Sequence, residues 1–236
     1  MIVEESKKLL GKRLKREAAR IGWLRVPDVL AFRLWYRATQ SAADAAWIAD
    51  RLEALRQRYA PVPASVPVVR VTSPNSRECQ DFITAARPDI MLAMVKSMLA
   101  ERIFSIAAVG TFVLHPGICP EYRNSHGCFW ALANDDLDTV GMTMLRIDKG
   151  VDTGPVFGYF RTTFDEVTAT HIQIQNATVL DNLDAIAERF REIAGGTAAT
   201  IPINGRPSRV WGQPWLTAWL RWKRHARRRQ DARHRA

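Results

Sequence analysis

Two ionisable side chains stand at positions where this chain could carry out chemistry. His115 follows an apolar run at 111–114 and precedes a Pro-Gly loop, and Asp152 opens an Asp-Thr-Gly turn further along the chain. A histidine at the carboxyl end of a strand in an open α/β sheet lies where such sheets hold their ligands. An acid beside it can orient the imidazole or take up a proton. We therefore predict that His115 and Asp152 act together, although a lone histidine after a strand is more often structural.

Strands and helices that alternate along the middle of the chain would position these two residues. Short β-branched or apolar runs predict strands, and the segments between them carry helical spacing and N-cap residues. This alternation favours an α/β fold with a parallel, Rossmann-like sheet in residues 61–200. The expected strands are 68–71, 89–95, 111–115 and 141–147, and the expected helices are 75–86, 97–104, 127–134 and a long one at 166–194.

Two terminal segments flank this α/β unit. Residues 1–60 have apolar residues at spacings of three and four, which predicts a helical N-terminal segment, and the Pro-rich connector at 59–67 marks its boundary. Residues 201–236 form a Trp-rich, basic C-terminal extension, which leaves 61–200 as the catalytic domain. We expect four tryptophans to form one face of a terminal helix that packs on the core. They are Trp211, Trp215, Trp219 and Trp222.

The net charge of +10 is concentrated at the two ends of the chain. Residues 1–60 hold 13 Lys and Arg against 7 acidic residues, residues 221–236 hold 8 against 1, and residues 61–220 hold 13 against 16. A contact with nucleic acid or with an anionic membrane would therefore come from the ends, above all from the C-terminal tail. We favour the alternative, a solvated and partly disordered tail.

Several other classes of protein do not fit this sequence. No apolar run reaches the roughly 18 residues that cross a bilayer, and the N-terminus lacks the pattern of a secretory signal, so we expect a cytoplasmic chain. The cysteines Cys79, Cys119 and Cys128 form no CxxC pair, which fits a reducing compartment and leaves zinc without a ligand set. We expect no metal, and we expect the cysteines to pack rather than react.

The segments around His115 and Asp152 resemble the folate-dependent formyltransferases, the family of methionyl-tRNA, glycinamide-ribonucleotide and nucleotide-sugar formyltransferases. The family pattern runs Asn-x-His-Pro-Ser-Leu-Leu-Pro, then Tyr-Arg-Gly, Gly-x-Thr and Asp-x-Gly. The resemblance covers about residues 65–160. The family opens with a strand and a glycine-rich turn that we do not identify here, so we expect a late start. The matching residues are His115, Pro116, Pro120, Tyr122, Arg123, Gly141, Thr143, Asp152 and Gly154.

The resemblance implies transfer of a formyl group from the co-substrate 10-formyltetrahydrofolate to a primary amine, through a tetrahedral intermediate. It implies that His115 stabilises the oxyanion, and that Asp152 sets the protonation of His115 and relays the proton. It also implies a set of residues that bind the folate. These are Met94, Val95, Lys96, Ser97, Met98 and Leu99 after the second expected strand, together with Gly117, Ile118, Cys119, Pro120, Thr143 and Asp148.

One departure from the family pattern concerns the oxyanion. The family Asn two residues before the histidine falls on Val113, which has no hydrogen-bond donor. Loss of one such donor typically costs roughly 10²–10³ in rate. Asn124 and His126 are the nearest polar residues that could support the oxyanion instead. The alternative function is a non-catalytic or hydrolytic relative that binds folate.

Overall fold

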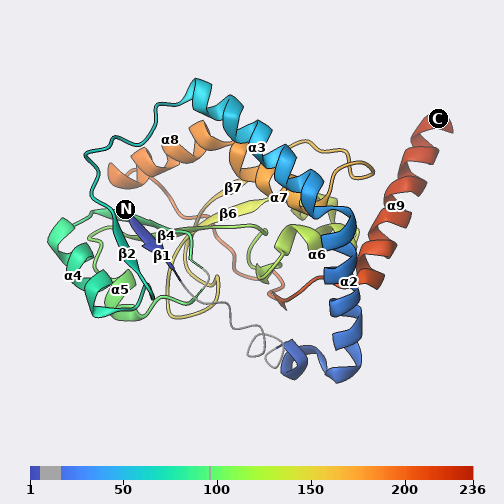
Figure 1. Ribbon diagram of the computed structural model, residues 1–236, viewed down its shortest axis with the longest axis horizontal. Helices are drawn as coiled ribbons and strands as arrows, with labels where there is room; N and C mark the ends of the chain where they lie inside the picture. Colours follow the sequence, from blue (N-terminus) through green and yellow to red (C-terminus); the bar gives the residue numbers. More distant parts are fainter. Residues whose placement is uncertain (6–16, 96, 236) are drawn as a thin grey trace.

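A four-stranded sheet forms the centre of the molecule, whose computed structural model describes residues 1–5, 17–95 and 97–235 (Figure 1). The strand order is β3-β4-β6-β7. Two further pairs, β1 with β2 and β5 with β8, are each parallel. The α/β class that the sequence predicts is therefore confirmed. The strands are β1 (Ile2–Glu4), β2 (Val69–Val71), β3 (Ile90–Ala93), β4 (Gly110–His115), β5 (Arg123–Asn124), β6 (Met142–Arg146), β7 (Val156–Phe160) and β8 (Val210–Trp211).

Strand direction in the central sheet differs from the expectation. β3 and β4 are parallel, but β6 runs antiparallel to β4, and β7 antiparallel to β6. The prediction of a parallel sheet is therefore wrong for the strands that follow β4. For β6 and β7 the reason is the connection, because 147–155 contains no helix and is shorter than a parallel crossover requires.

The N-terminal strand β1 is an element that the sequence reasoning missed. Its residues pair in register with β2, Ile2 opposite Val69 and Glu4 opposite Val71. The segment 1–60 is therefore not wholly helical. A run of three residues is too short to show the alternation by which a strand is recognised.

Helices pack around the sheet, with α3, α7 and α8 together on one side and α2 and α9 at the end away from β1 (Figure 1). None of the helices in the described part of the chain is long and apolar enough to cross a membrane. The helices are η1 (Trp23–Arg25), α2 (Val26–Thr39), α3 (Ser41–Arg58), α4 (Arg77–Ala86), α5 (Glu101–Phe104), α6 (Gly127–Ala133), η2 (Leu137–Thr139), α7 (His171–Leu180), α8 (Leu183–Ala194) and α9 (Leu216–Arg235).

The single long helix expected at 166–194 is two helices instead. α7 begins only after Thr170, whose hydroxyl accepts from the Gln173 backbone while the Gln173 side chain accepts from the Thr170 backbone. This reciprocal capping box fixes the start of the helix. α7 then ends at Leu180, and α8 starts at Leu183. The turn between them redirects the chain so that the two helices cover different parts of the sheet (Figure 1).

Alternation along β4 divides its side chains between a core and a site. Phe112 is fully buried and packs edge to face against Phe157 and Phe190, with ring centroids 5.3 and 5.7 Å apart. Val113 and His115 point to the opposite face, because successive side chains of a strand alternate. The strand that carries the histidine is therefore held by the core beneath it.

The C-terminal tryptophans enter a second core, although not all of them from one helix. Trp222 on α9 is fully buried, and Trp219 packs against Trp35 of α2 with the two rings tilted. Trp211 belongs to β8 and Trp215 precedes α9, so the single aromatic helix face that we expected is wrong. The tail is also helical as far as Arg235 rather than partly disordered.

Candidate active site

His115, the last residue of β4, is held by two acceptors. Its side chain is only 4% exposed. Nε2 lies 2.7 Å from the Tyr122 carbonyl oxygen, and Nδ1 lies 3.3 Å from Asp152 Oδ2. Because a carbonyl oxygen can only accept, Nε2 carries a proton and donates it to Tyr122. Nδ1 then faces a carboxylate, and this geometry suits a proton shared between the imidazole and Asp152.

Asp152 connects the histidine to the neighbouring strand β5. Its Oδ2 also accepts from the Asn124 backbone N–H at 2.7 Å. Its backbone has φ of 52°, in the left-handed region that side chains other than glycine rarely adopt. The turn fits against β6 only because residue 154 is glycine, since a Cβ there would overlap the Arg146 carbonyl oxygen. The Asp-x-Gly motif therefore aims the carboxylate at His115.

The loop after His115 depends on a close backbone approach at Gly117. A Cβ at this position would lie 2.5 Å from the Tyr122 carbonyl oxygen and 2.8 Å from His115 Nε2. Thr143 on β6 holds the same loop, because its hydroxyl donates to Gly117 O at 2.6 Å and accepts from Cys119 N at 2.9 Å. Thr143 is fully buried. The Gly-x-Thr motif thus positions the loop from beneath.

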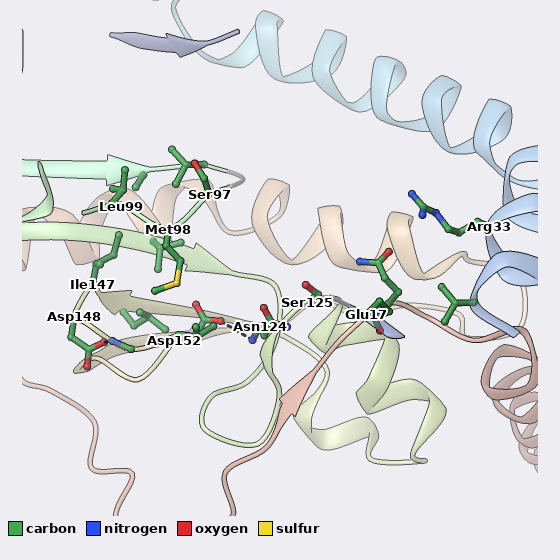
Figure 2. A pocket seen from close by; sticks show the side chains of 18 residues that line it. Glu17, Arg33, Ser97, Met98, Leu99, Asn124, Ser125, Ile147, Asp148 and Asp152 are labelled. Atoms are coloured by element: carbon green, nitrogen blue, oxygen red, sulfur yellow. Dashed lines mark hydrogen bonds between the residues drawn. The ribbon is translucent and has the colours of Figure 1, made fainter. Parts of the chain in front are cut away.

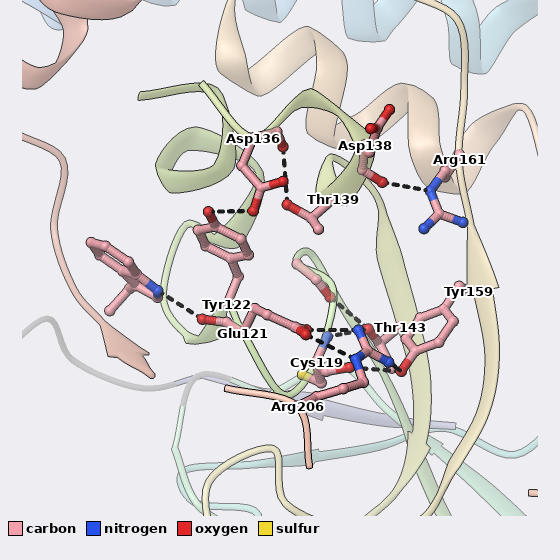
Figure 3. A network of polar contacts seen from close by, with 12 residues as sticks. Cys119, Glu121, Tyr122, Asp136, Asp138, Thr139, Thr143, Tyr159, Arg161 and Arg206 are labelled. Atoms are coloured by element: carbon pink, nitrogen blue, oxygen red, sulfur yellow. Dashed lines mark hydrogen bonds and ion pairs between the residues drawn. The ribbon is translucent and has the colours of Figure 1, made fainter. Parts of the chain in front are cut away.

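A polar network fixes the far side of this loop (Figure 3). Arg206 makes a bidentate pair with Glu121, at 2.8 and 2.7 Å, and donates to the Tyr159 hydroxyl at 2.6 Å. The Tyr159 hydroxyl in turn donates to the Cys119 carbonyl oxygen at 2.7 Å. Trp211 donates its indole N–H to the Glu121 carbonyl oxygen at 2.9 Å. Side chains from distant parts of the chain therefore fix the backbone that faces His115.

Beside this pair lies a cleft of about 500 Å³. Its floor includes one row of apolar side chains across three strands, because Val113 pairs with Ala93 on β3 and with Leu145 on β6. Asp152 opens into the cleft, its side chain 16% exposed, whereas His115 lies behind it and is not part of the lining. In this structure Asp152 is therefore the member of the pair that is open to the cleft.

The two ends of the cleft differ in chemistry (Figure 2). The apolar end lies over the sheet and is lined by Ala93, Val95, Met98, Leu99, Val113, Leu145 and Ile147, with Ser97 and Asp148 at its edge. The polar end is lined by Glu17, Arg33, Ser125 and Gln213, with Val29 beside them. Asn124 and Asp152 lie between the two ends.

Only some of the residues expected to bind folate line the cleft in the structure. Val95, Ser97, Met98, Leu99 and Asp148 line the cleft. Met94 is 84% exposed and outside the lining, and Lys96 lies outside the described residues. The other group is buried behind the cleft and outside its lining. It consists of Gly117, Ile118, Cys119, Pro120 and Thr143.

Of the two residues expected to support an oxyanion, only Asn124 lines the cleft. Its backbone N–H is bound to Asp152, and its side-chain amide donates to the Trp211 carbonyl oxygen. His126 caps α6 outside the lining, with Nδ1 buried and without a partner among the described residues. Burial lowers the pKa of His126 to about 4, so the ring is neutral at pH 7.

The cysteines near the loop are unreactive. Cys119 and Cys128 are buried, and burial raises the pKa of each thiol to about 12. Both thiols are therefore protonated at neutral pH, which removes the nucleophilic thiolate.

Among the residues that the structure describes, no group of three or more His, Cys, Asp or Glu side chains could hold a metal ion.

Sequence reasoning missed the polar end of the cleft. Glu17, Arg33, Ser125 and Gln213 come from four separate segments. Only the i, i+4 spacing of Val29 and Arg33 could have shown that two lining residues share a helix face. No sequence pattern shows which surface that face meets.

Comparison with known proteins shows that the chain is similar to formyltransferases. No family model matches the chain. It is 29% identical over 151 residues to methionyl-tRNA formyltransferase of Chlorobium chlorochromatii, which covers 64% of this chain and 47% of that protein. It is 26% identical over 159 residues to GDP-perosamine N-formyltransferase of Brucella melitensis, covering 62% and 61%.

A solved structure shows the same fold. A sugar N-formyltransferase from a Shewanella species matches with a TM-score of 0.51 at 12% identity, over 71% of this chain and 72% of that one. The chain spans about half the length of the methionyl-tRNA formyltransferase that it matches. The resemblance that the motifs indicate is therefore confirmed, and this chain is a relative of the formyltransferases.

Proposed function

We propose that the chain transfers a formyl group from 10-formyltetrahydrofolate to a primary amine. The observation that carries this proposal is the contact between His115 and Asp152 beside a cleft with one apolar and one polar end. The motifs of this chain support it, because Gly117, Thr143 and Gly154 each have a structural task beside this pair.

Asp152 is suited to move the proton of the acceptor. It opens into the cleft and lies against His115 Nδ1, so it can take a proton from an attacking amine. The new bond between the amine nitrogen and the formyl carbon gives a tetrahedral intermediate, and its collapse breaks the bond between that carbon and N10 of the donor. The proton then passes to N10, and tetrahydrofolate leaves.

His115 is suited to stabilise the oxyanion once its Nε2–H has exchanged the Tyr122 carbonyl oxygen for the substrate oxygen as its hydrogen-bond acceptor. Its Nε2 proton is bound to the Tyr122 carbonyl oxygen in this structure. To act on the substrate, Nε2 must leave that carbonyl and donate to the formyl oxygen. The negative charge that develops on this oxygen makes it the stronger acceptor, which favours the exchange in the transition state.

The apolar end of the cleft fits the pterin part of the donor. Its floor is apolar, and Asn75 fixes the backbone at its rim, because its amide donates to Met98 O at 2.9 Å and accepts from Ala100 N at 2.6 Å. A rim held in this way can present peptide groups to a flat polar ring. We propose that residues 61–200 form the donor-binding and catalytic unit, and that 1–60 and 201–236 serve the acceptor.

Release of tetrahydrofolate tests the proposal. Purified protein is incubated with 10-formyltetrahydrofolate and a panel of primary amines, and tetrahydrofolate and formylated amine are measured. We expect amine-dependent release that His115→Ala abolishes. His234→Ala, which changes an exposed histidine of α9, is the matched control and should leave release unchanged. Absence of release with every amine would contradict the proposal.

Val113 is the observation that favours a second candidate function, in which the chain binds folate without formyl transfer. Its apolar side chain lines the cleft at the position of the family Asn, so a donor to the oxyanion is lacking there. The alternative is a relative that binds folate without transfer or that hydrolyses the donor. Measurable folate binding with no release would support binding alone, and release that no amine accelerates would support hydrolysis.

A further inference from the structure

The polar end of the cleft contains a guanidinium with no hydrogen-bond or ion-pair partner among the residues that the structure describes. Arg33 extends from α2 toward the cleft (Figure 2). It forms no ion pair with a carboxylate of residues 1–5, 17–95 or 97–235. Glu17, the acid at the same end, is already engaged by Arg20 and by the Gln213 backbone N–H at 3.1 Å. A positive charge therefore remains available to a ligand at this end.

The helix that carries Arg33 is firmly held. Val29 and Phe32 are buried, and the Phe32 ring packs 5.5 Å from Phe129 of α6. Asp28 accepts from the Thr217 backbone N–H at 3.0 Å at the start of α9. Because Val29 and Arg33 lie four residues apart, both face the cleft from one side of α2. Packing of the helix therefore fixes the backbone position from which the exposed Arg33 side chain extends.

The other acids of the cleft are also occupied. Asp148 accepts from Gly150 N at 2.9 Å and from the Thr153 hydroxyl at 2.7 Å. Asp152 is engaged by His115 and Asn124. An arginine that has no carboxylate partner among the described residues, in a cleft whose acids are already engaged, is suited to an anion from outside the protein.

Residues 124–126 lie between the polar end of the cleft and the pair of His115 and Asp152. Arg33 and Glu17 line the cleft together with Ser125, which lies between Asn124 and His126 in the chain. Residues 124–126 then lead to Asn124, whose backbone N–H is bound to Asp152. A ligand held at Arg33 would thus extend along these residues toward Asp152.

We propose that Arg33 binds an oxyanion group, a phosphate or a carboxylate, of the amine acceptor. The inference rests on the proposed function, because it treats the polar end as the acceptor end. The planar guanidinium can hold either oxyanion through two parallel hydrogen bonds. The acceptor class is therefore an amine that carries a negative charge, with its amino group directed at Asp152.

Binding of simple anions tests this assignment. Inorganic pyrophosphate and succinate are titrated separately by calorimetry into the full chain at about 0.15 M salt, where exposed charges are largely screened. We expect one of them to bind, and Arg33→Ala to weaken that binding by about 10-fold or more. Pyrophosphate alone would identify a phosphate, and succinate alone a carboxylate.

Arg37→Ala is the matched control. Arg37 lies one turn further along α2, is exposed and is outside the lining of the cleft, so its loss should leave anion binding unchanged. Arg33→Lys should recover only part of the affinity, because an ammonium lacks the planar pair of donors. Equal binding by the unchanged chain and Arg33→Ala, or no binding of either anion, would overturn the proposal.

A separate readout distinguishes this inference from the proposed function. Release of tetrahydrofolate without any acceptor should be the same in Arg33→Ala and in the unchanged chain, since Arg33 lies away from the donor end. If no release occurs under any condition but Arg33 still governs anion binding, the transfer activity fails and the anion site stands.

Discussion

The two ends of the cleft are built in different ways. The apolar end rests on β3, β4 and β6, which pair in fixed register, so Ala93, Val113 and Leu145 form one row. The polar end is assembled by α2, by the turn before α6, and by the segments around Glu17 and Gln213. Backbone pairing defines the first end, and side-chain packing between distant segments defines the second. The difference teaches that the sheet fixes one end of the cleft, where we propose that the donor binds, while segments far apart in the chain form the other end.

The largest expected effect on the rate of formyl transfer comes from replacing His115 or Asp152. His115→Ala and Asp152→Ala should each reduce formyl transfer by about 10²–10⁴, because each removes a group that handles a proton or charge in the transition state. The double variant should lose little more than either single one, as residues that act as a unit do. Rates with saturating donor and amine provide the measurement.

Folate affinity should largely survive in these variants, since neither residue belongs to the apolar end. Additive losses in the double variant would show that the two residues act separately and would contradict a shared proton.

The next effect concerns Val113 at the apolar end. Val113→Asn places an amide donor in the floor of the cleft, where the family has one, and should raise the rate by up to about 10²–10³ if the site is an impaired transferase. Val113→Ala is the control, because it changes the same position without adding a donor. Unchanged turnover in Val113→Asn, together with full activity in His115→Ala, would remove the catalytic assignment.

A smaller effect is expected beneath the loop at Thr143. Thr143→Val keeps the shape but leaves Gly117 O and Cys119 N without their partner, at a cost of about 1–3 kcal/mol in the free energy of unfolding. Thr143→Ser retains the hydroxyl and should cost less. Urea denaturation measures both, and equal stability of the Val variant and the unchanged chain would exclude Thr143 as the support of this loop.

The smallest effect is a pH dependence of stability near the polar end. Burial lowers the pKa of His126 to about 4 and that of His171 well below its usual 6.5. Between pH 6.5 and 4 the unfolded chain binds more protons than the folded one, so stability is lost as the pH falls through this range. We expect Tm to fall by about 5 °C or more from pH 7 to pH 5.

His126→Asn should make this decline shallower by removing one of the two titrating groups. The exposed His234 gives the comparison, because His234→Ala should leave the slope unchanged. An identical slope in His126→Asn would show that His126 is not neutral through burial.

Local patterns in the sequence predicted much of the donor side. His115 and Asp152 were predicted as a pair from residue type and position, and the resemblance added Gly117 and Thr143, whose tasks beneath and beside the loop only the structure gave. The α/β class and the expected strands follow from short apolar runs in the same way. These features depend on residues that are neighbours in the chain or in a paired strand.

Other features depended on where the chain turns. The antiparallel direction of β6 and β7, the division of the expected helix at 166–194, and the strand β1 each arise from connections or pairings that periodicity does not report. The tryptophans show the same limit, since helical spacing placed Trp211 and Trp215 on a helix that begins only at Leu216.

The sequence by itself determined which residues could react, because residue type and short spacing specify chemistry. Only the tertiary structure decided that Asp152 opens into the cleft while His115 lies behind it, and that Arg33 reaches the same cleft from α2. The physical reason is that burial and long-range contact depend on how helices and loops pack, through many weak interactions between residues far apart in the chain.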